Sequence, residues 1–299
     1  MPSPSRLGRL WLHALLLILT LATTTAIGAR MVANFRQNLP AFDVERDLLP
    51  AFVNIVADPL SLAVGLPFSL TLIAILLAHE FGHYLACRYY KVDASLPYFM
   101  PAPTFIGTLG AFIRIRSAVY SKRVLFDIGI AGPLAGFVFL LPALGIGLAY
   151  SKVLPGIGER GDFVFGVPAL MWLLEKAIFP GVHAADIYLH PVARAAWVGI
   201  FATAINLLPI GQLDGGHIMY AFAGERHRLF SKVFIAALIP LGFLYWPWFL
   251  WAAVLMLLGL WRHPPVFDPG RLSPGRRKLG YLALFIFGLC FMAAPIASS

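Results

Sequence analysis

The sequence predicts an all-α polytopic membrane protein, with six or seven transmembrane helices and a small β-hairpin at the membrane boundary. Of its 299 residues, 60% are hydrophobic and only 12% are charged. Such a chain has too little polar surface to cover a soluble particle, so lipid must be its solvent. Several apolar stretches approach the ~20 residues that a helix needs to cross hydrocarbon. They lie at about 10–29, 60–87, 124–150, 192–209, 229–245, 247–261 and 279–296.

Residues 1–58 predict an N-terminal transmembrane anchor followed by an external loop. Arg6 and Arg9 precede an apolar stretch that ends in small residues at 26–29, a pattern that also fits a cleavable signal sequence. The stretch is long enough to span a membrane, so we expect a retained helix. The loop ends in Asp58-Pro59, a helix cap followed by a proline suited to the first helical position. We therefore expect the second span to begin there.

The C-terminal part, residues 225–299, contains the remaining spans. Residues 229–261 form either a hairpin of two spans, pinched at Trp246-Pro247-Trp248, or one long kinked helix, which leaves the total at six or seven. Residues 262–278 contain four prolines and a basic cluster, and predict a linker before the last span.

Two connections between the spans have predicted structure of their own. Residues 151–191 form a second external loop, in which the apolar stretch 167–179 is expected to lie along the membrane surface as a short helix. Residues 96–117, LPYFMPAPTFIGTLGAFIRIRS, predict the β-hairpin, because prolines exclude a regular helix and residues 113–116 alternate isoleucine with arginine as a strand does. Gly107 and Gly110 supply the turn. The alternative is a surface loop.

Charge predicts the orientation of the chain. Most of the 23 lysines and arginines flank the span ends that share a side with the N-terminus. Because basic short loops stay in the cytoplasm, we expect an integral protein of the bacterial inner membrane with its N-terminus facing the cytoplasm. The orientation in the membrane and contact with anionic lipid then explain the net charge of +9. The sequence does not alternate basic with aromatic residues in the way that would indicate nucleic-acid binding. The two cysteines, Cys87 and Cys290, exclude a disulfide framework and a thiolate zinc cluster.

The motif HEFGH, residues 79–83, places costly polar groups near the cytoplasmic end of the second span. His79 and His83 are four residues apart, so on a helix both imidazoles can bind one ion. Glu80 lies beside that stripe, where it can take a proton from a metal-bound water without being a ligand. Because burying such groups in a membrane is expensive, we interpret the motif as a hydrolytic zinc site.

A catalytic zinc site normally has three protein ligands, so a third must come from elsewhere in the chain. Asp214 is the leading candidate, because it lies at the cytoplasmic end of another span, in NLLPIGQLDGGH, residues 206–217. Asp127 and His217 are alternatives, and Cys87 shares the histidine stripe but is expected to be a packed small residue.

Two further motifs are expected to shape the site. Pro209 breaks the span that contains Asn206, so the backbone near Asp214 can bend inward and admit water. Asn206 either donates to a developing oxyanion or bonds a neighbouring helix. In AGPLAG, residues 131–136, Gly132 and Gly136 have the spacing that lets two helices approach closely, and packing is their whole expected role.

Together these motifs resemble the site-2 protease family of intramembrane zinc metalloproteases. HEFGH, GTLGAFIRIRS, AGPLAG and NLLPIGQLDGG occur in the order of the family, over the catalytic membrane core that we place at 59–224. The resemblance implies one Zn²⁺ per chain held by His79, His83 and Asp214. It also implies that Glu80 is the catalytic base and that Asn206 assists in the active site.

The resemblance further implies a transmembrane protein substrate, cleaved in the lipid bilayer near the cytoplasmic face, in some cases after a first cut by an upstream site-1-type protease. An extended substrate would pair with the hairpin as an added strand. Many bacterial members carry a PDZ domain between the motifs that correspond to AGPLAG and NLLPIGQLDGG. Here the segment from Gly136 to Asn206 must supply parts of two spans and a loop, so a PDZ domain does not fit. The chain instead resembles the PDZ-lacking branch that includes plant plastid and cyanobacterial members.

Two other functions fit part of the sequence. A membrane metal transporter would explain histidines inside a span, although it gives no role to Glu80 or to the hairpin. A catalytically silent scaffold that binds membrane helices would explain the hairpin, although it gives no role to the intact motif.

Overall fold

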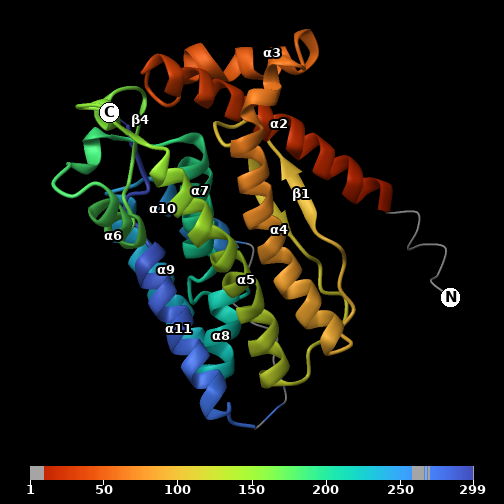
Figure 1. Ribbon diagram of the computed structural model, residues 1–299. Helices are drawn as coiled ribbons and strands as arrows, with labels where there is room; N and C mark the ends of the chain where they lie inside the picture. Colours follow the sequence, from red (N-terminus) through yellow and green to blue (C-terminus); the bar gives the residue numbers. More distant parts are fainter. Residues whose placement is uncertain (1–9, 258–265, 267, 269, 299) are drawn as a thin grey trace.

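The computed structural model describes residues 10–257, 266, 268 and 270–298, and helices dominate it (Figure 1). Among the described residues, three helical segments are long and apolar enough to cross a membrane. They are α2 (Leu10–Gln37), the continuous segment Ser61–Tyr89 and α5 (Lys122–Ala149). The chain is therefore a membrane protein by length and composition of its helices.

The other predicted spans correspond to shorter helices. They are α7 (Pro191–Asn206), α9 (His227–Gly242), α10 (Pro247–Leu257) and α11 (Pro274–Cys290). Helices α9 and α10 pack against each other and are separated by a turn at 243–246, so this region is a hairpin rather than one kinked helix. Because these helices are short, the total of six or seven spans stays a prediction, as does the division of the chain into three parts.

Helix α11 differs from the predicted last span at both ends. Ser273 caps it, with Pro274 at the first helical position, so it begins before residue 279. It ends at Cys290, and the chain then becomes extended and forms β6 (Ile296–Ser298). The basic residues Arg276 to Lys278 consequently lie in the helix, and part of the predicted linker lies outside the described residues.

The first predicted external loop is largely helical. A π-helical turn, η1 (Val44–Leu48), and α3 (Leu49–Ala57) follow α2. The buried Asp47 carboxylate fastens η1 to α2, because it accepts hydrogen bonds of 2.8 Å from Arg30, Asn34 and Arg46. The side chain of Asp58 accepts a hydrogen bond of 3.3 Å from the backbone N–H of Ser61. Pro59 lies in a turn rather than at the first helical position, and the segment begins two residues later as a 3₁₀ turn, η2 (Ser61–Gly65), before α4 (Leu66–Tyr89).

The small residues at 26–29 lie at a close helix contact rather than at a helix end. A Cβ atom on Gly28 would lie 2.9 Å from the Cβ of Phe68 and 3.2 Å from the Cα of Gly65. Helix α2 continues unbroken through this point to Gln37. Close packing against the second span thus accounts for the residues that also suit a signal sequence, and a retained anchor remains our prediction.

The second predicted external loop contains the expected surface helix, α6 (Ala169–Ile178), with Trp172 and Leu173 exposed and Leu170 and Met171 buried. Its short strands were not predicted, because runs of two or three residues carry no alternation to detect. Strand β3 (Lys152–Val153) pairs with β5 (Ile187–Tyr188), and β4 (Phe163–Phe165) pairs with β6. Two single turns of 3₁₀ helix, η3 (Ile157–Glu159) and η4 (Ala184–Asp186), complete this loop. A third, η5 (Gly224–Arg226), lies outside it and directly precedes α9.

The predicted β-hairpin is confirmed. Strand β1 (Tyr98–Pro101) pairs antiparallel with β2 (Thr108–Phe112), and both lie against α2. Gly107 adopts φ 84°, and a Cβ atom there would lie 2.8 Å from the Cα of Thr24. The strand prediction for residues 113–116 is wrong, because the partner segment before β1 supports only an isolated bridge between Ala94 and Ile115.

Helices α4, α5 and α7 pack together at the centre of the molecule, and α8 (Asp214–Ala223) lies beside α5 (Figure 1). Their contacts bury large apolar side chains such as Ile75, Phe126, Leu140 and Ile200. The polar residues of α4 therefore lie within closely packed helices.

Candidate active site

Helix α4 presents His79 and His83 on one buried face, with 6% and 7% of their surfaces exposed. Gly82 lies where α4 crosses α5, and a Cβ atom there would lie 2.8 Å from the carbonyl carbon of Ala131. The glycine therefore lets the two helices come close together.

Helix α5 orients the histidine rings. The carbonyl oxygen of Ile128 can only accept, so Nδ1 of His83 donates to it at 2.7 Å and Nε2 is left free to bind an ion. Gly132 and Gly136 make room for the rings: a Cβ on Gly132 would lie 2.5 Å from two His83 ring carbons, and one on Gly136 would lie 3.1 Å from Cβ of His79. The packing role predicted for these glycines is directed at the histidines themselves.

Asp214 reaches the histidines because the chain turns sharply after α7. Helix α7 ends at Asn206, and α8 begins at Asp214. A Cβ atom on Gly215 would lie 2.6 Å from the carbonyl oxygen of Leu208, so only glycine permits this tight turn. The expected break after Asn206 is thus present, and it delivers Asp214 to the face of α4.

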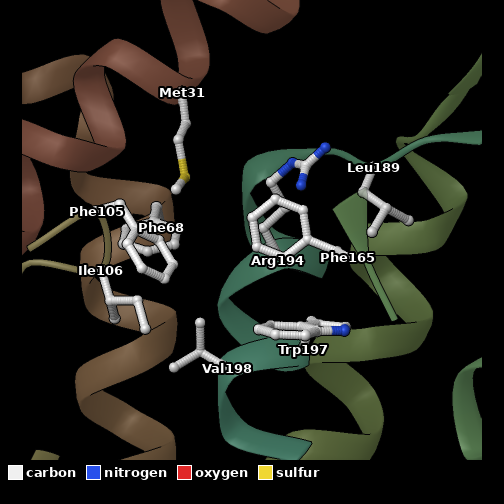
Figure 2. Close-up of a pocket in the computed structure, with 9 residues that line it drawn as sticks. All are labelled: Met31, Phe68, Phe105, Ile106, Phe165, Leu189, Arg194, Trp197 and Val198. Carbon is white, nitrogen blue, oxygen red and sulfur yellow. The ribbon is translucent and has the colours of Figure 1, made fainter. Parts of the chain in front are cut away.

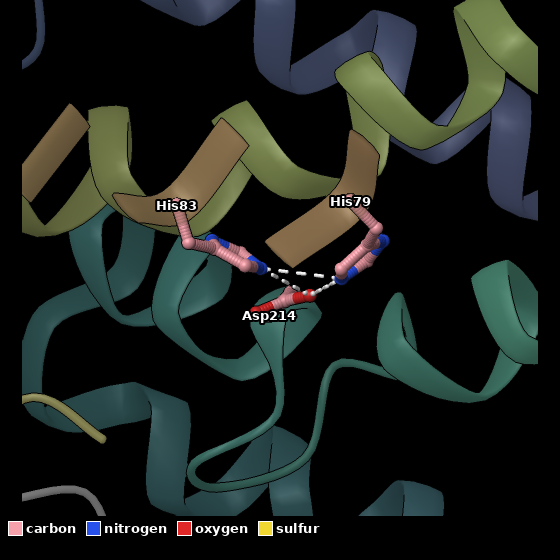
Figure 3. Close-up of side chains that lie close together, drawn as sticks. All are labelled: His79, His83 and Asp214. Carbon is pink, nitrogen blue, oxygen red and sulfur yellow. Dashed lines mark hydrogen bonds and ion pairs between the residues drawn. The ribbon is translucent and has the colours of Figure 1, made fainter. Parts of the chain in front are cut away.

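The three side chains converge (Figure 3). Oδ2 of Asp214 lies 3.1 Å from Nε2 of His79 and 3.2 Å from Nε2 of His83, and the two nitrogens are 3.2 Å apart. A tetrahedral zinc ion with bonds of about 2.0–2.1 Å has ligand atoms about 3.3 Å apart. The donors therefore have the spacing of one face of a zinc tetrahedron, and two imidazoles with a carboxylate are a donor set that zinc accepts.

Glu80 and Asn206 border this group. Glu80 is 6% exposed, and its carboxylate lies near the backbone N–H of Ile113, just beyond β2. The side-chain nitrogen of Asn206 lies 3.3 Å from Nε2 of His79. A carboxylate and an amide thus flank the histidine pair, and the carboxylate lies beside the hairpin segment.

The other candidate ligands are not members of the group found among the described residues. Asp127 forms an ion pair of 2.7 Å with Arg276 and accepts a hydrogen bond of 2.5 Å from Tyr90. Cys87 is buried one turn beyond His83. His217 packs its Cβ toward Gly129.

Sequence reasoning missed two backbone contributors. Ile128 acts through its carbonyl oxygen and Ile113 through its N–H, so neither side chain marks the contact. The only available signal was position, since Ile113 belongs to the hairpin segment and Ile128 lies three residues before AGPLAG in the packing helix.

Comparisons with known proteins were made for the whole chain. Residues 67–245 match the model of Peptidase family M50. "Probable zinc metalloprotease EGY1, chloroplastic" of Oryza sativa subsp. japonica is 31% identical over 258 residues, covering 82% of this chain and 43% of that protein. The EGY1 protein of Arabidopsis thaliana is 28% identical over 309 residues, covering 97% and 54%. The chain spans about half the length of these curated relatives.

Proposed function

The chain belongs to peptidase family M50, the site-2 protease family, and from this we propose that it is an intramembrane zinc metalloendopeptidase. It would hydrolyse peptide bonds of membrane-spanning proteins near the cytoplasmic face, as in regulated intramembrane proteolysis. The observation that carries the proposal is the convergence of His79, His83 and Asp214 beside a buried Glu80. The curated relatives are named probable zinc metalloproteases, which supports one Zn²⁺ per chain as the cofactor.

The residues divide the chemistry among themselves. His79, His83 and Asp214 would hold the zinc ion, which when bound polarises a peptide carbonyl and lowers the pKa of water to about 7. Glu80 would take the proton of the attacking water and pass it to the leaving amine. Asn206 would donate from its amide to the carbonyl oxygen as negative charge develops there. Ile113 would hold the Glu80 carboxylate in place between these steps.

The hairpin supports an extended substrate. Strand β2 pairs with β1 alone among the described residues, so its other edge is open to an added strand, and Leu109 and Phe112 beside it are exposed. A helical substrate must unwind there, because its hydrogen-bonded carbonyls are otherwise hidden from water. Residues that break helices are therefore expected near the cleavage site.

We further propose the orientation predicted from charge, in a bacterial inner membrane with the N-terminus and the metal site toward the cytoplasm. The substrate would arrive after an upstream site-1-type protease has shortened its external part.

Reconstitution with a candidate membrane substrate tests the function. The zinc-loaded chain and the Glu80→Gln variant are compared in vesicles, with cleavage and zinc content measured on the same samples. We expect cleavage by the unaltered chain alone, with equal zinc in both. Zinc flux into the vesicles without cleavage would instead identify a transporter, and binding of the substrate without either would identify a scaffold.

A further inference from the structure

A second polar site lies at the other end of α7 from the metal-binding residues. A cavity of about 50 Å³ lies between the 151–191 loop, the start of α7 and Ala41, and its lining includes Arg160, Glu175 and Arg194. A smaller apolar pocket of about 10 Å³ adjoins it and shares Arg194, Phe165 and Trp197 (Figure 2). Arg194 and Asn206 are twelve residues apart on one helix, or about 18 Å at ~1.5 Å per residue.

Arg194 has no anionic partner among the described residues. Its guanidinium carbon lies 5.1 Å from the ring centroid of Phe165 and 5.8 Å from that of Tyr188. No hydrogen bond or ion pair joins its guanidinium to any residue in the described part of the chain, whereas its backbone N–H donates to the carbonyl oxygen of His190. Aromatic faces attract a cation only weakly compared with a carboxylate or phosphate, so the charge of Arg194 is incompletely matched.

Glu175 does not supply the missing charge. It is 4% exposed, it lines the same cavity, and its Oε2 has no hydrogen-bond partner among the described residues. Burial raises the pKa of Glu175 to about 7, against the opposing effect of Lys176, so much of this carboxyl group is protonated near neutral pH. The cavity therefore has a net positive charge and a second polar group that can bind a ligand.

The size of the cavity limits the anion. One water molecule needs about 10–15 Å³ by the same measure, so the larger cavity has room for a few non-hydrogen atoms, such as a carboxylate group. The adjoining pocket is apolar but takes no more than a methyl-sized group, which excludes a lipid acyl chain. A peptide that ends in a small apolar residue supplies both a carboxylate group for the larger cavity and a small apolar side chain for the adjoining pocket.

We propose that this cavity binds the free α-carboxylate of a peptide chain end, with Arg194 as its cationic partner. Resting on the proposed proteolysis, the occupant is the shortened external end of a substrate. About 18 Å corresponds to roughly twelve helical residues or five to six extended ones between the bound end and the metal site. The hairpin tip lies nearby, because the ring of Phe105 is 5.0 Å from that of Phe163 and 6.5 Å from that of Phe165.

Peptide binding tests the proposal without requiring catalysis. The probe is a hexapeptide ending in alanine, whose side chain is one methyl group, labelled with fluorescein at its N-terminus and prepared with a free carboxylate or a carboxamide. Fluorescence anisotropy measures its binding to the full chain carrying Glu80→Gln in phosphatidylcholine nanodiscs. The acid should bind about 10- to 100-fold more tightly than the amide, the range for one charge-assisted hydrogen-bonded contact. Because this comparison leaves the cavity unaltered, it does not depend on how a variant folds.

Two substitutions then assign the effect. Arg194→Gln should remove the difference between acid and amide, whereas Arg36→Gln, which removes an exposed arginine at the end of α2, should preserve it. Equal binding of acid and amide would overturn the proposal, as would a difference that survives Arg194→Gln. Displacement of the acid by phosphatidylglycerol in the nanodisc would assign the cavity to a lipid phosphate and would also overturn it. A failed proteolysis assay leaves this binding result unchanged, so the two proposals fail separately.

Discussion

Replacing Gly132 by alanine should disable the metal site through His83. The added Cβ would lie 2.5 Å from two ring carbons of His83, whereas ordinary van der Waals contact is 3.4–4 Å. The ring must therefore retreat by about 1 Å, and the hydrogen bond from its Nδ1 to Ile128 prevents a simple rotation. Overpacking of this kind costs about 1–3 kcal/mol of stability, and a ~1 Å misplacement in an active site can cost about 100-fold in rate.

The assay measures zinc affinity and cleavage rate on the purified Gly132→Ala variant. We expect about 10- to 100-fold weaker zinc binding, as for other changes that disturb the orientation of a ligand, and about 100-fold slower cleavage. Gly145→Ala is the matched control, because it lies in the same helix and a Cβ there meets nothing within 4 Å. A Gly132→Ala chain with unaltered zinc affinity and rate would refute the role of α5 in holding the ring.

Three further predictions follow from other contacts. Replacing Ile113 by proline removes the N–H that lies near the Glu80 carboxylate, so the cleavage rate should fall about tenfold while zinc is retained. Ile113→Ala keeps this N–H and should cleave at the normal rate. Equal cleavage rates for the two variants would contradict the role of the Ile113 N–H. Burial raises the pKa of Asp47, but hydrogen bonds from Arg46, Arg30 and Asn34 outweigh burial and hold this pKa below its usual range. The ionised carboxylate therefore stabilises the fold above about pH 4, and this stabilisation is lost as pH falls through the folded-state pKa. Asp47→Asn should thus lower the free energy of unfolding by about 1.5–3 kcal/mol at pH 7 and by progressively less as pH falls below about 4, and a loss that does not change with pH would refute this. Chelation should abolish cleavage and lower the thermal unfolding midpoint, both restored by Zn²⁺, and an unchanged midpoint would argue against metal bound in the folded state.

Much of the fold followed from periodicity and hydropathy. Each apolar stretch has a helix, the hairpin lies where prolines exclude a helix, and α6 lies within the apolar part of the external loop. These features depend on patterns of many residues, which a single sequence contains. The ends of α11 and the strand after Phe112 were wrong, because a cap or a partner segment decides them and neither follows from hydropathy.

The proposed metal-binding group was accessible to sequence reasoning for a chemical reason. A histidine pair inside an apolar helix needs a partner, and acidic residues are so scarce in the apolar parts that Asp214 was the leading choice over Asp127. The contacts of Ile128 and Ile113 were not accessible, because every residue type except proline has the same backbone groups. The unpaired charge of Arg194 was also hidden, since it depends on which side chains the 151–191 loop places around it.

The zinc content of the Asp214→Asn chain, measured against Asp127→Asn after dialysis with a weak chelator, tests the central claim most directly. Asp127 is the matched control because its carboxylate pairs with Arg276 rather than with the histidines. We predict that the unaltered chain and the Asp127→Asn chain keep one zinc each and that the Asp214→Asn chain loses it. Retention of zinc by Asp214→Asn, or its loss from Asp127→Asn alone, would contradict the ligand set of His79, His83 and Asp214.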